Sequence, residues 1–230
     1  MEQHPIVNQE QWIAARKELL AKEKEFTRLR DKLNAERRAL PWVRVERAYA
    51  FDGPEGQRSL SELFEDKSQL VVYHLMFEPQ NEAACRGCSF WADAFDGMRR
   101  HLAQRDVRLV AISRAPLAKL EKFKQRMGWS FPWYSAEDER FNVAYGVTFP
   151  DLASRAQYNF GSTRAAQGEQ PGLSVFARDA SGAVFHTYSC YARGIDALNP
   201  TYQYLDLVPK GRDEAGFDFP MAWLRHHDAY

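Results

Sequence analysis

The chain has 230 residues, of which 45% are hydrophobic, and its 31 basic residues are balanced by 31 acidic ones. This length and composition suit one large domain with a hydrophobic core, or one domain with an extension. The zero net charge argues against a nucleic-acid partner, because such proteins usually carry a basic surface. No apolar run reaches the roughly 18 residues of a membrane-spanning helix, so no membrane association is expected.

Two further features predict a cytoplasmic protein. Residues Met1 to Pro5 lack the basic flank and the apolar core of a secretory signal peptide. The chain has three cysteines, whereas a secreted disulfide scaffold uses more of them, in pairs. In a reducing compartment a closely spaced cysteine pair indicates redox chemistry or metal binding rather than a structural crosslink.

Residues 8–40 have the pattern of one long helix, and Pro41 ends it because proline cannot continue a helix. An apolar stripe recurs every seven residues at Trp12, Leu19, Phe26, Leu33 and Leu40, between charges of mixed sign. The stripe is expected to pack on the core of the same chain, and a homodimer contact is the alternative. Residues 1–41 are therefore expected to form an N-terminal helical extension to a domain of residues 42–230.

The remaining residues alternate between strand and helix patterns. Strands are expected at 43–51, 69–77 and 107–113, and helices at 59–64, 86–104 and 116–127, followed by a short extended segment at 131–134. Residues 151–170 are polar and are expected to form an inserted loop. Two strands at 172–178 and 183–190 flank a turn at 179–182, which is a hairpin signal, and 221–227 has the pattern of a short terminal helix.

Alternating strands and helices predict an α/β fold, in which a central mixed sheet is flanked by helices and closed by an antiparallel hairpin. This is a thioredoxin-like arrangement, in which the first core strand leads to a Cys-x-x-Cys pair at the start of the first core helix. Cys85 and Cys88 occupy these positions, after the apolar run 69–77.

The cysteine pair predicts thiol–disulfide chemistry. Cys85, at the helix N-terminus, is expected to be the nucleophile, because free backbone N–H groups and the helix dipole favour its thiolate. Cys88, one turn further on, is expected to be the resolving thiol that attacks a mixed disulfide. Arg86 places a positive charge between the two thiols, next to Gly87, and is expected to lower the pKa of Cys85 further.

Other residues are expected to support this pair. Pro171 directly precedes the strand at 172–178 and is expected to be a cis-proline that faces the cysteines, a position at which thioredoxin-like folds use one. Trp91 is expected to pack the active-site helix or line the cleft, and His74 to lie in the core below the dithiol, where it could accept a proton. Cys190 ends the returning hairpin strand and is a possible third thiol at the same edge, on the face shared with His186 and Tyr188.

Several stretches resemble one known family. They are Pro41–Val45, Leu70–Phe77, Cys85–Asp93, Ser113–Leu117, Met127–Trp133 and His186–Gly194. On these stretches the chain is similar to domain-of-unknown-function family 899, bacterial thioredoxin-like proteins described as predicted dithiol–disulfide oxidoreductases. The resemblance covers nearly the whole chain and implies a thioredoxin-like fold with redox chemistry. Family members often carry Pro-Ser between the cysteines, whereas this chain has Arg86-Gly87.

The leading hypothesis is a thiol–disulfide oxidoreductase that needs no cofactor beyond the dithiol and whose partner is a protein or small-molecule disulfide or thiol. A peroxiredoxin-like thiol peroxidase is the enzymatic alternative, although Glu78 and Glu82 occupy the positions of the Pro and Thr in that family's Pro-x-x-x-Thr-x-x-Cys loop. A binding scaffold without redox catalysis, or a zinc site completed by Cys190 and His186, is the non-enzymatic alternative. No metal is expected, because no second paired motif is present.

Overall fold

The computed structural model describes residues 4–166 and 168–230, and the chain divides into two compact units at Pro41. The first unit contains one helix, α1 (Gln9–Arg38), which begins with a capping box. The side chain of Asn8 accepts from the backbone N–H of Gln11, and the side chain of Gln11 accepts from the N–H of Asn8. No helix among the described residues has the length and the apolar character needed to cross a bilayer.

The apolar stripe of α1 is exposed in this structure. None of the helix's residues is buried, and Phe26, at the middle of the stripe, is 65% exposed. Packing on the core of the chain and contact with a second copy therefore both stay predictions.

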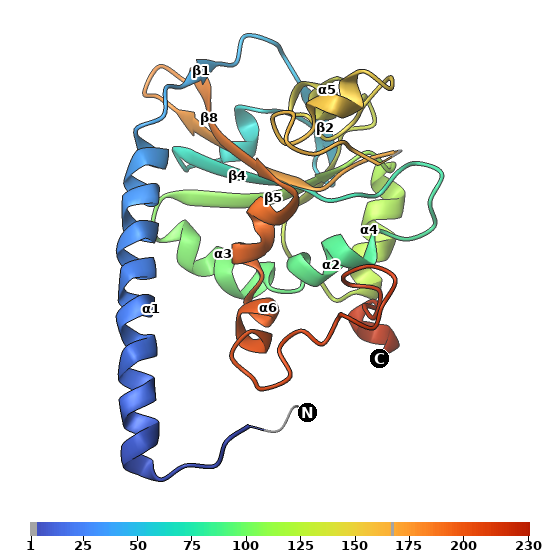
Figure 1. Cartoon of the computed structure of the whole chain (residues 1–230). Helices are drawn as coiled ribbons and strands as arrows, with labels where there is room; N and C mark the ends of the chain where they lie inside the picture. Colours follow the sequence, from blue (N-terminus) through green and yellow to red (C-terminus); the bar gives the residue numbers. More distant parts are fainter. Residues whose placement is uncertain (1–3, 167) are drawn as a thin grey trace. The chain divides into compact units, whose positions relative to one another are not determined.

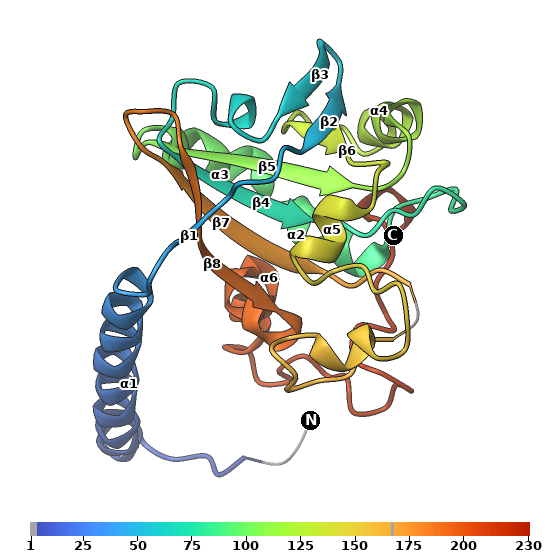
Figure 2. The same cartoon turned by 90° about the horizontal axis from the view of Figure 1, so that it is seen from above.

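The second unit, residues 42–230, is built on a mixed sheet that has eight strands among the described residues, in the order β1-β8-β7-β4-β5-β6-β2-β3 (Figures 1 and 2). The strands are β1 (Val43–Arg44), β2 (Ala50–Gly53), β3 (Gly56–Ser59), β4 (Gln69–His74), β5 (Val107–Ser113), β6 (Trp133–Ser135), β7 (Gly172–Arg178) and β8 (Val184–Tyr191). Strands β4, β5 and β6 are parallel, while β7 is antiparallel to β4 and β8 to β7. The order β5-β4-β7-β8, with helices between β4 and β5, confirms the thioredoxin-like arrangement.

Helices cover both faces of this sheet. They are α2 (Arg86–Ala92), α3 (Phe95–Ala103), α4 (Leu117–Arg126), α5 (Arg140–Ala144) and α6 (Pro200–Leu205), with short 3-10 turns η1 (Glu62–Phe64), η2 (Ser154–Gln157), η3 (Ala192–Leu198) and η4 (His227–Ala229). Figure 1 shows α2, α3, α4 and α6 on one side of the sheet and α5 on the other.

Successive residues of β4 belong to two different hydrophobic cores, because side chains alternate between the faces of a strand. Tyr73 and the following Leu75 pack into the core beneath α2, α3 and α4, which also contains Cys88. Val72 belongs to the core on the opposite face, together with Phe141 of α5. This alternation decides which residues of β4 can reach the cysteine pair.

The expected helix at 86–104 is two helices, α2 and α3, separated at Asp93 and Ala94. The carboxylate of Asp93 accepts from the indole N–H of Trp129 and pairs with His227, and Phe95 turns into the core. These tertiary contacts end the first helix after seven residues.

Two other expected elements differ. The strand expected at 43–51 is only the two-residue β1 followed by the start of β2. The terminal helix expected at 221–227 is absent from these described residues. Met221 has a left-handed φ of +70°, and His226 near the other end has an extended backbone with a ψ of 145°.

Candidate active site

The cysteine pair lies where the loop after β4 meets α2, and the backbone of Met76 hydrogen-bonds to both cysteines. The backbone N–H of Cys85 donates to the carbonyl of Met76 over 2.9 Å, and the N–H of Met76 donates to Cys88 Sγ over 3.4 Å. Cys85 is the residue that precedes α2, and its carbonyl accepts from both the N–H and the hydroxyl of Ser89, each at 2.9 Å. The loop of residues 77–84 therefore returns the chain to the end of β4 and sets the position of the two thiols.

The two thiols have opposite acid–base properties. A hydrogen bond from the Cys88 thiol and, less strongly, the backbone N–H groups of Cys88 and Gly87 and the charge of Arg86 outweigh burial and lower the pKa of Cys85 to about 6. Burial, followed by the interaction with Cys85, raises the pKa of Cys88 well above its usual range. Both cysteines are free thiols, and Cys85 is the more exposed. At neutral pH the pair is therefore one thiolate beside one thiol.

The sequence predicted that the helix dipole and Arg86 would lower the pKa of Cys85, but other groups contribute more. The neighbouring thiol makes the largest contribution, and the charge of Arg86 makes the smallest of those named. Because α2 has only seven residues, the N–H groups of its first turn act on the sulfur as individual donors rather than through a long helix dipole.

Tyr73 is the residue of the site that sequence reasoning missed. Its side chain is 1% exposed, and its hydroxyl has no nitrogen or oxygen partner among the described residues. Burial and then the adjacent Cys88 thiol raise the pKa of Tyr73 well above its usual value, so it remains a neutral donor. Alternation along β4 places Tyr73 and His74 on opposite faces of the sheet, and the packing of α2 determines that Tyr73 is the one facing the dithiol.

The expectation for His74 is wrong for the same reason. His74 shares the face of Val72, on the side of the sheet opposite Cys88, and its ring lies 5.6 Å from that of Phe141 between centroids. Its Nε2 is 2.9 Å from the Ser174 hydroxyl. Burial lowers the pKa of His74 to about 3, so it is a neutral core residue and does not contact the dithiol.

The expectation of a cis peptide bond before Pro171 is also wrong, because every described peptide bond of the chain is trans. The trans bond is the lower-energy form, and hydrogen bonds hold the backbone on both sides of it. Gln170 N–H donates to the Val147 carbonyl over 2.9 Å, and the Tyr158 hydroxyl donates to the Pro171 carbonyl over 2.9 Å. Pro171 nevertheless lines the same cavity as the two cysteines.

A cavity of about 570 Å³ opens beside the cysteine pair. Cys85, Gly87, Cys88, Trp91 and Pro171 line it, together with residues of the C-terminal part of the chain. Arg86 is exposed and does not line the cavity, so it acts on Cys85 through its charge. The Trp91 indole N–H donates to the Ile195 carbonyl over 2.9 Å, which fixes its ring in the wall.

Cys190 and His186 lie on different faces of the sheet. Cys190 is buried in the same core as Cys88 and Tyr73, and its role as a third thiol stays a prediction. The expectation that His186 shares its face is wrong, because an irregularity between Val175 and Phe176 shifts the register of β7 and β8. The ring of His186 consequently lies near Tyr145 and Phe176 of the other core.

The zinc alternative is therefore not supported. Its four ligands would have to come from both faces of the sheet. The described residues contain no group of three or more His, Cys, Asp or Glu side chains placed to hold a metal ion.

The topology and the site together define a thioredoxin-like α/β protein with a paired-cysteine site. The chain belongs to the family described as "Bacterial protein of unknown function (DUF899)", whose sequence model matches residues 1–230. This is the family that the sequence motifs indicated. The search of curated proteins found no match.

Among solved structures the chain is similar to peroxiredoxins. Xanthomonas campestris peroxiredoxin Q has 15% sequence identity and a TM-score of 0.47, over 66% of this chain and 85% of that one. Peroxidoxin BcpB from Mycobacterium tuberculosis has 18% identity and a TM-score of 0.48, over 72% of this chain and 97% of that one. A likeness this remote does not transfer a reaction.

Proposed function

We propose that this protein is a thiol–disulfide oxidoreductase in which Cys85 attacks and Cys88 resolves. The observation that carries the proposal is the position of two thiols one turn apart at the start of α2, both hydrogen-bonded to Met76 and the first of them more exposed. These surroundings lower the pKa of Cys85 to about 6 and raise that of Cys88. The more exposed sulfur is thus a thiolate at neutral pH, and the buried one keeps its proton until it is needed.

The reaction would proceed in two exchanges. The Cys85 thiolate attacks one sulfur of a disulfide, so that a bond between Cys85 Sγ and that sulfur forms, the original S–S bond breaks, and the other half leaves as a thiolate that takes a proton. Cys88 then loses its proton and attacks Cys85 Sγ, which releases the second half as a thiolate that is protonated in turn. The protein dithiol is oxidised to a disulfide, and the substrate disulfide is reduced to two thiols.

This chemistry needs no cofactor beyond the two cysteines, and its partner is a protein or small-molecule disulfide. We place it in the cytoplasm, which is supported by the small and odd number of cysteines. The peroxidase alternative has no added support in the loop before Cys85. Glu82 is an exposed carboxylate there that pairs with Lys119, and Glu78 accepts from the N–H of Glu169.

The proposal is tested by oxidising the reduced protein with bis(2-hydroxyethyl) disulfide at pH 7 and identifying the crosslinks by mass spectrometry. The wild type should form a Cys85–Cys88 disulfide, and Cys88→Ser should accumulate a mixed disulfide at Cys85. Cys85→Ser should react on the order of 100-fold more slowly, because the remaining thiol of the pair is protonated at this pH.

Cys190→Ser is the matched control and should keep the wild-type rate. A protein that forms no bond between Cys85 and Cys88, or a Cys85→Ser variant that reacts as fast as wild type, would refute the proposal.

A further inference from the structure

The cavity beside the dithiol has two walls from different parts of the chain. The inner wall consists of Tyr73, Met76, Cys85 and residues of α2 that include Cys88. The outer wall consists of η3, α6 and the segment that follows them, including Met221, whose sulfur lies 3.9 Å from the position of a Cβ on Gly87. A segment of the chain's C-terminal part therefore lies across the cavity from the cysteines.

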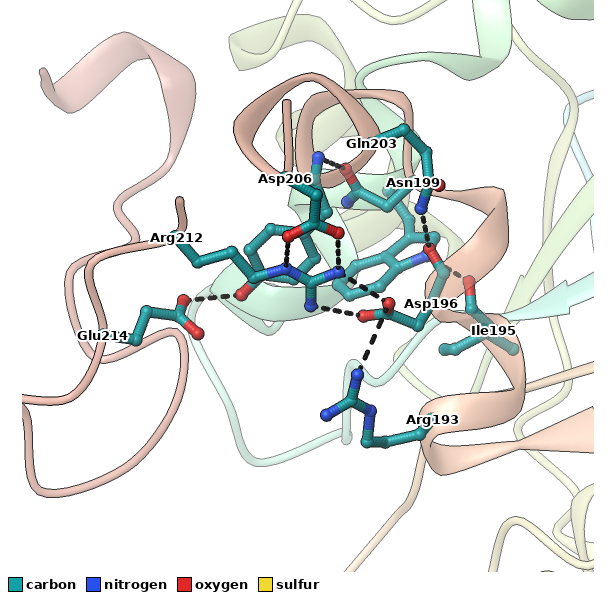
Figure 3. A network of polar contacts seen from close by, with 10 residues as sticks. Arg193, Ile195, Asp196, Asn199, Gln203, Asp206, Arg212 and Glu214 are labelled. Carbon is teal, nitrogen blue, oxygen red and sulfur yellow. Dashed lines mark hydrogen bonds and ion pairs between the residues drawn. The ribbon is translucent and has the colours of Figure 1, made fainter. Parts of the chain in front are cut away.

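The charged groups of the outer wall are mostly satisfied internally. Arg212 holds two carboxylates at once (Figure 3): its Nη1 and Nη2 donate to Asp196 over 2.9 and 2.8 Å, and its Nε and Nη2 donate to Asp206 over 2.8 and 2.7 Å. Its guanidinium also lies 3.9 Å from the centre of the Tyr202 ring. This arginine is therefore not available to bind an anionic ligand.

The remaining charges of the lining do not favour an anion either. Glu214 Oε1 accepts from the Tyr202 hydroxyl at 2.7 Å, from the Met221 N–H at 3.0 Å and from the Trp223 indole at 2.7 Å. Arg193 is 87% exposed and its guanidinium lies 3.8 Å from Asp196. In all, two guanidinium groups face three carboxylates around the cavity, so its net charge is negative.

The rest of the lining is apolar or aromatic, apart from the two thiols and two tyrosine hydroxyls, of which that of Tyr202 already donates to Glu214. The side chains of Met76, Trp91, Ile195, Pro220 and Met221 supply the apolar surface. The Tyr73 hydroxyl is buried beside the Cys88 thiol, which is a weak acceptor, and it has no nitrogen or oxygen partner among the described residues. A stronger acceptor on a bound molecule would therefore gain a hydrogen bond from it. The volume of about 570 Å³ is within the range of about 300–1,000 Å³ typical of small-molecule sites.

We infer that the substrate of the dithiol is a small, uncharged, largely apolar disulfide that enters this cavity and accepts a hydrogen bond from Tyr73. The inference rests on the proposed function and narrows its substrate class. Cys85 attacks the disulfide from the inner wall, and the Tyr73 hydroxyl donates to the bound molecule beside Cys88. A folded protein disulfide is excluded by the outer wall, and an anionic small disulfide is disfavoured by the carboxylates.

The test measures single-turnover oxidation of the reduced protein by three probes. These are 4,4′-dithiodipyridine, which is uncharged and aromatic; 5,5′-dithiobis(2-nitrobenzoate), which is aromatic and dianionic; and insulin, a protein disulfide. Each rate is divided by the rate of the same probe with N-acetylcysteine, which removes differences in intrinsic reactivity. The normalised rate with dithiodipyridine should saturate with concentration and exceed the other two at least tenfold.

Two pairs of variants distinguish the contribution of the cavity lining from general effects of a substitution on the reaction rate. Met221→Lys adds a cation to the lining and should narrow the preference for the uncharged probe, whereas Leu207→Lys, at an exposed position outside the lining, should not. Tyr73→Phe should lower the efficiency with dithiodipyridine about tenfold, as expected for one lost hydrogen bond, while the alkylation pKa of Cys85 stays unchanged. Tyr204→Phe, at an exposed position of α6, should have no effect.

The inference is overturned if the normalised rates are equal, if insulin or the dianionic probe reacts fastest, or if Tyr73→Phe and Met221→Lys behave as wild type. In those cases a Cys85–Cys88 disulfide would still form, and the proposed function would stand. Failure to form that disulfide with any probe would instead refute the proposed function.

Discussion

At the scale of single residues, the groups around a side chain determine its acid–base properties more than the residue type does. Cys85 and Cys88 carry the same thiol, yet their pKa values move in opposite directions, because hydrogen bonds to the Cys85 sulfur outweigh its burial, whereas burial dominates at Cys88. The cysteine pair was predictable from its spacing. Tyr73 was not, because its role depends on which face of β4 lies against α2, and a sequence with apolar residues on both faces does not reveal that.

His74 gives a prediction for stability. Its pKa is about 3 in the folded protein, below the ordinary 6.5, so between these values the unfolded state binds a proton that the folded state does not. The stabilising contribution is complete above pH 6.5 and is lost as the pH falls toward 3, by about 2 kcal/mol at pH 5. His74→Phe should therefore flatten the loss of unfolding free energy between pH 7 and pH 4.5.

Urea unfolding at several pH values measures this effect. His186, whose pKa is also lowered by burial, remains in the variant and leaves a smaller slope of the same sign. Ser174 keeps a partner in the hydroxyl of Ser189, 2.9 Å away. Equal slopes for wild type and His74→Phe would contradict the prediction, and His101→Gln, on the exposed side of α3, is the control.

At the scale of elements, the longer and strongly patterned segments were predictable. The strands β4 and β5, helix α4 and the β7–β8 hairpin lie where apolar runs, helical spacing and the turn at 179–182 placed them. The helices α5 and α6, of five and six residues, were missed because fewer than two turns show no clear periodicity. The register shift that separates His186 from Cys190 was also not readable, since it is set by pairing with β7.

Strand β7 begins beside the cavity at Gly172, and its packing leaves no room for a side chain. A Cβ there would lie 2.7 Å from Tyr191 Cδ1 and 2.9 Å from Val147 Cγ1. Because the Tyr191 hydroxyl is held by the Tyr145 carbonyl at 2.7 Å, the ring cannot easily move away. Gly172→Ala should lower the free energy of unfolding by about 1–3 kcal/mol.

The matched control is Gly97→Ala in helix α3, where a Cβ meets nothing within 4 Å. This change should stabilise the protein by about 0.5–1 kcal/mol, because alanine loses less backbone entropy in a helix than glycine. Thermal or urea unfolding of the two variants measures both effects. A Gly172→Ala protein as stable as wild type would contradict the packing described for this strand.

At the scale of the whole thioredoxin-like unit, residues after β8 determine which molecules can reach the cysteines. The C-terminal segment is attached to the active-site region by a bond of 2.9 Å between His226 Nε2 and the Ala84 carbonyl and by a bidentate ion pair between Arg126 and Asp228 at 2.7 and 2.9 Å. No sequence motif predicted this attachment, because its partners are separated by more than a hundred residues. The result is a dithiol that opens into a cavity rather than onto a flat surface.

The pH dependence of Cys85 alkylation tests the polarised pair most directly. The thiolate is the reactive form, and its fraction rises with pH, so the rate of modification of reduced protein by iodoacetamide, assigned to each cysteine by mass spectrometry, reports the pKa. Cys85 should reach half of its maximal rate near pH 6, Cys88 should stay unmodified through pH 8, and Cys88→Ala should move the Cys85 midpoint upward. A Cys85 midpoint near the ordinary value of 9, unchanged in Cys88→Ala, would contradict the activated thiolate.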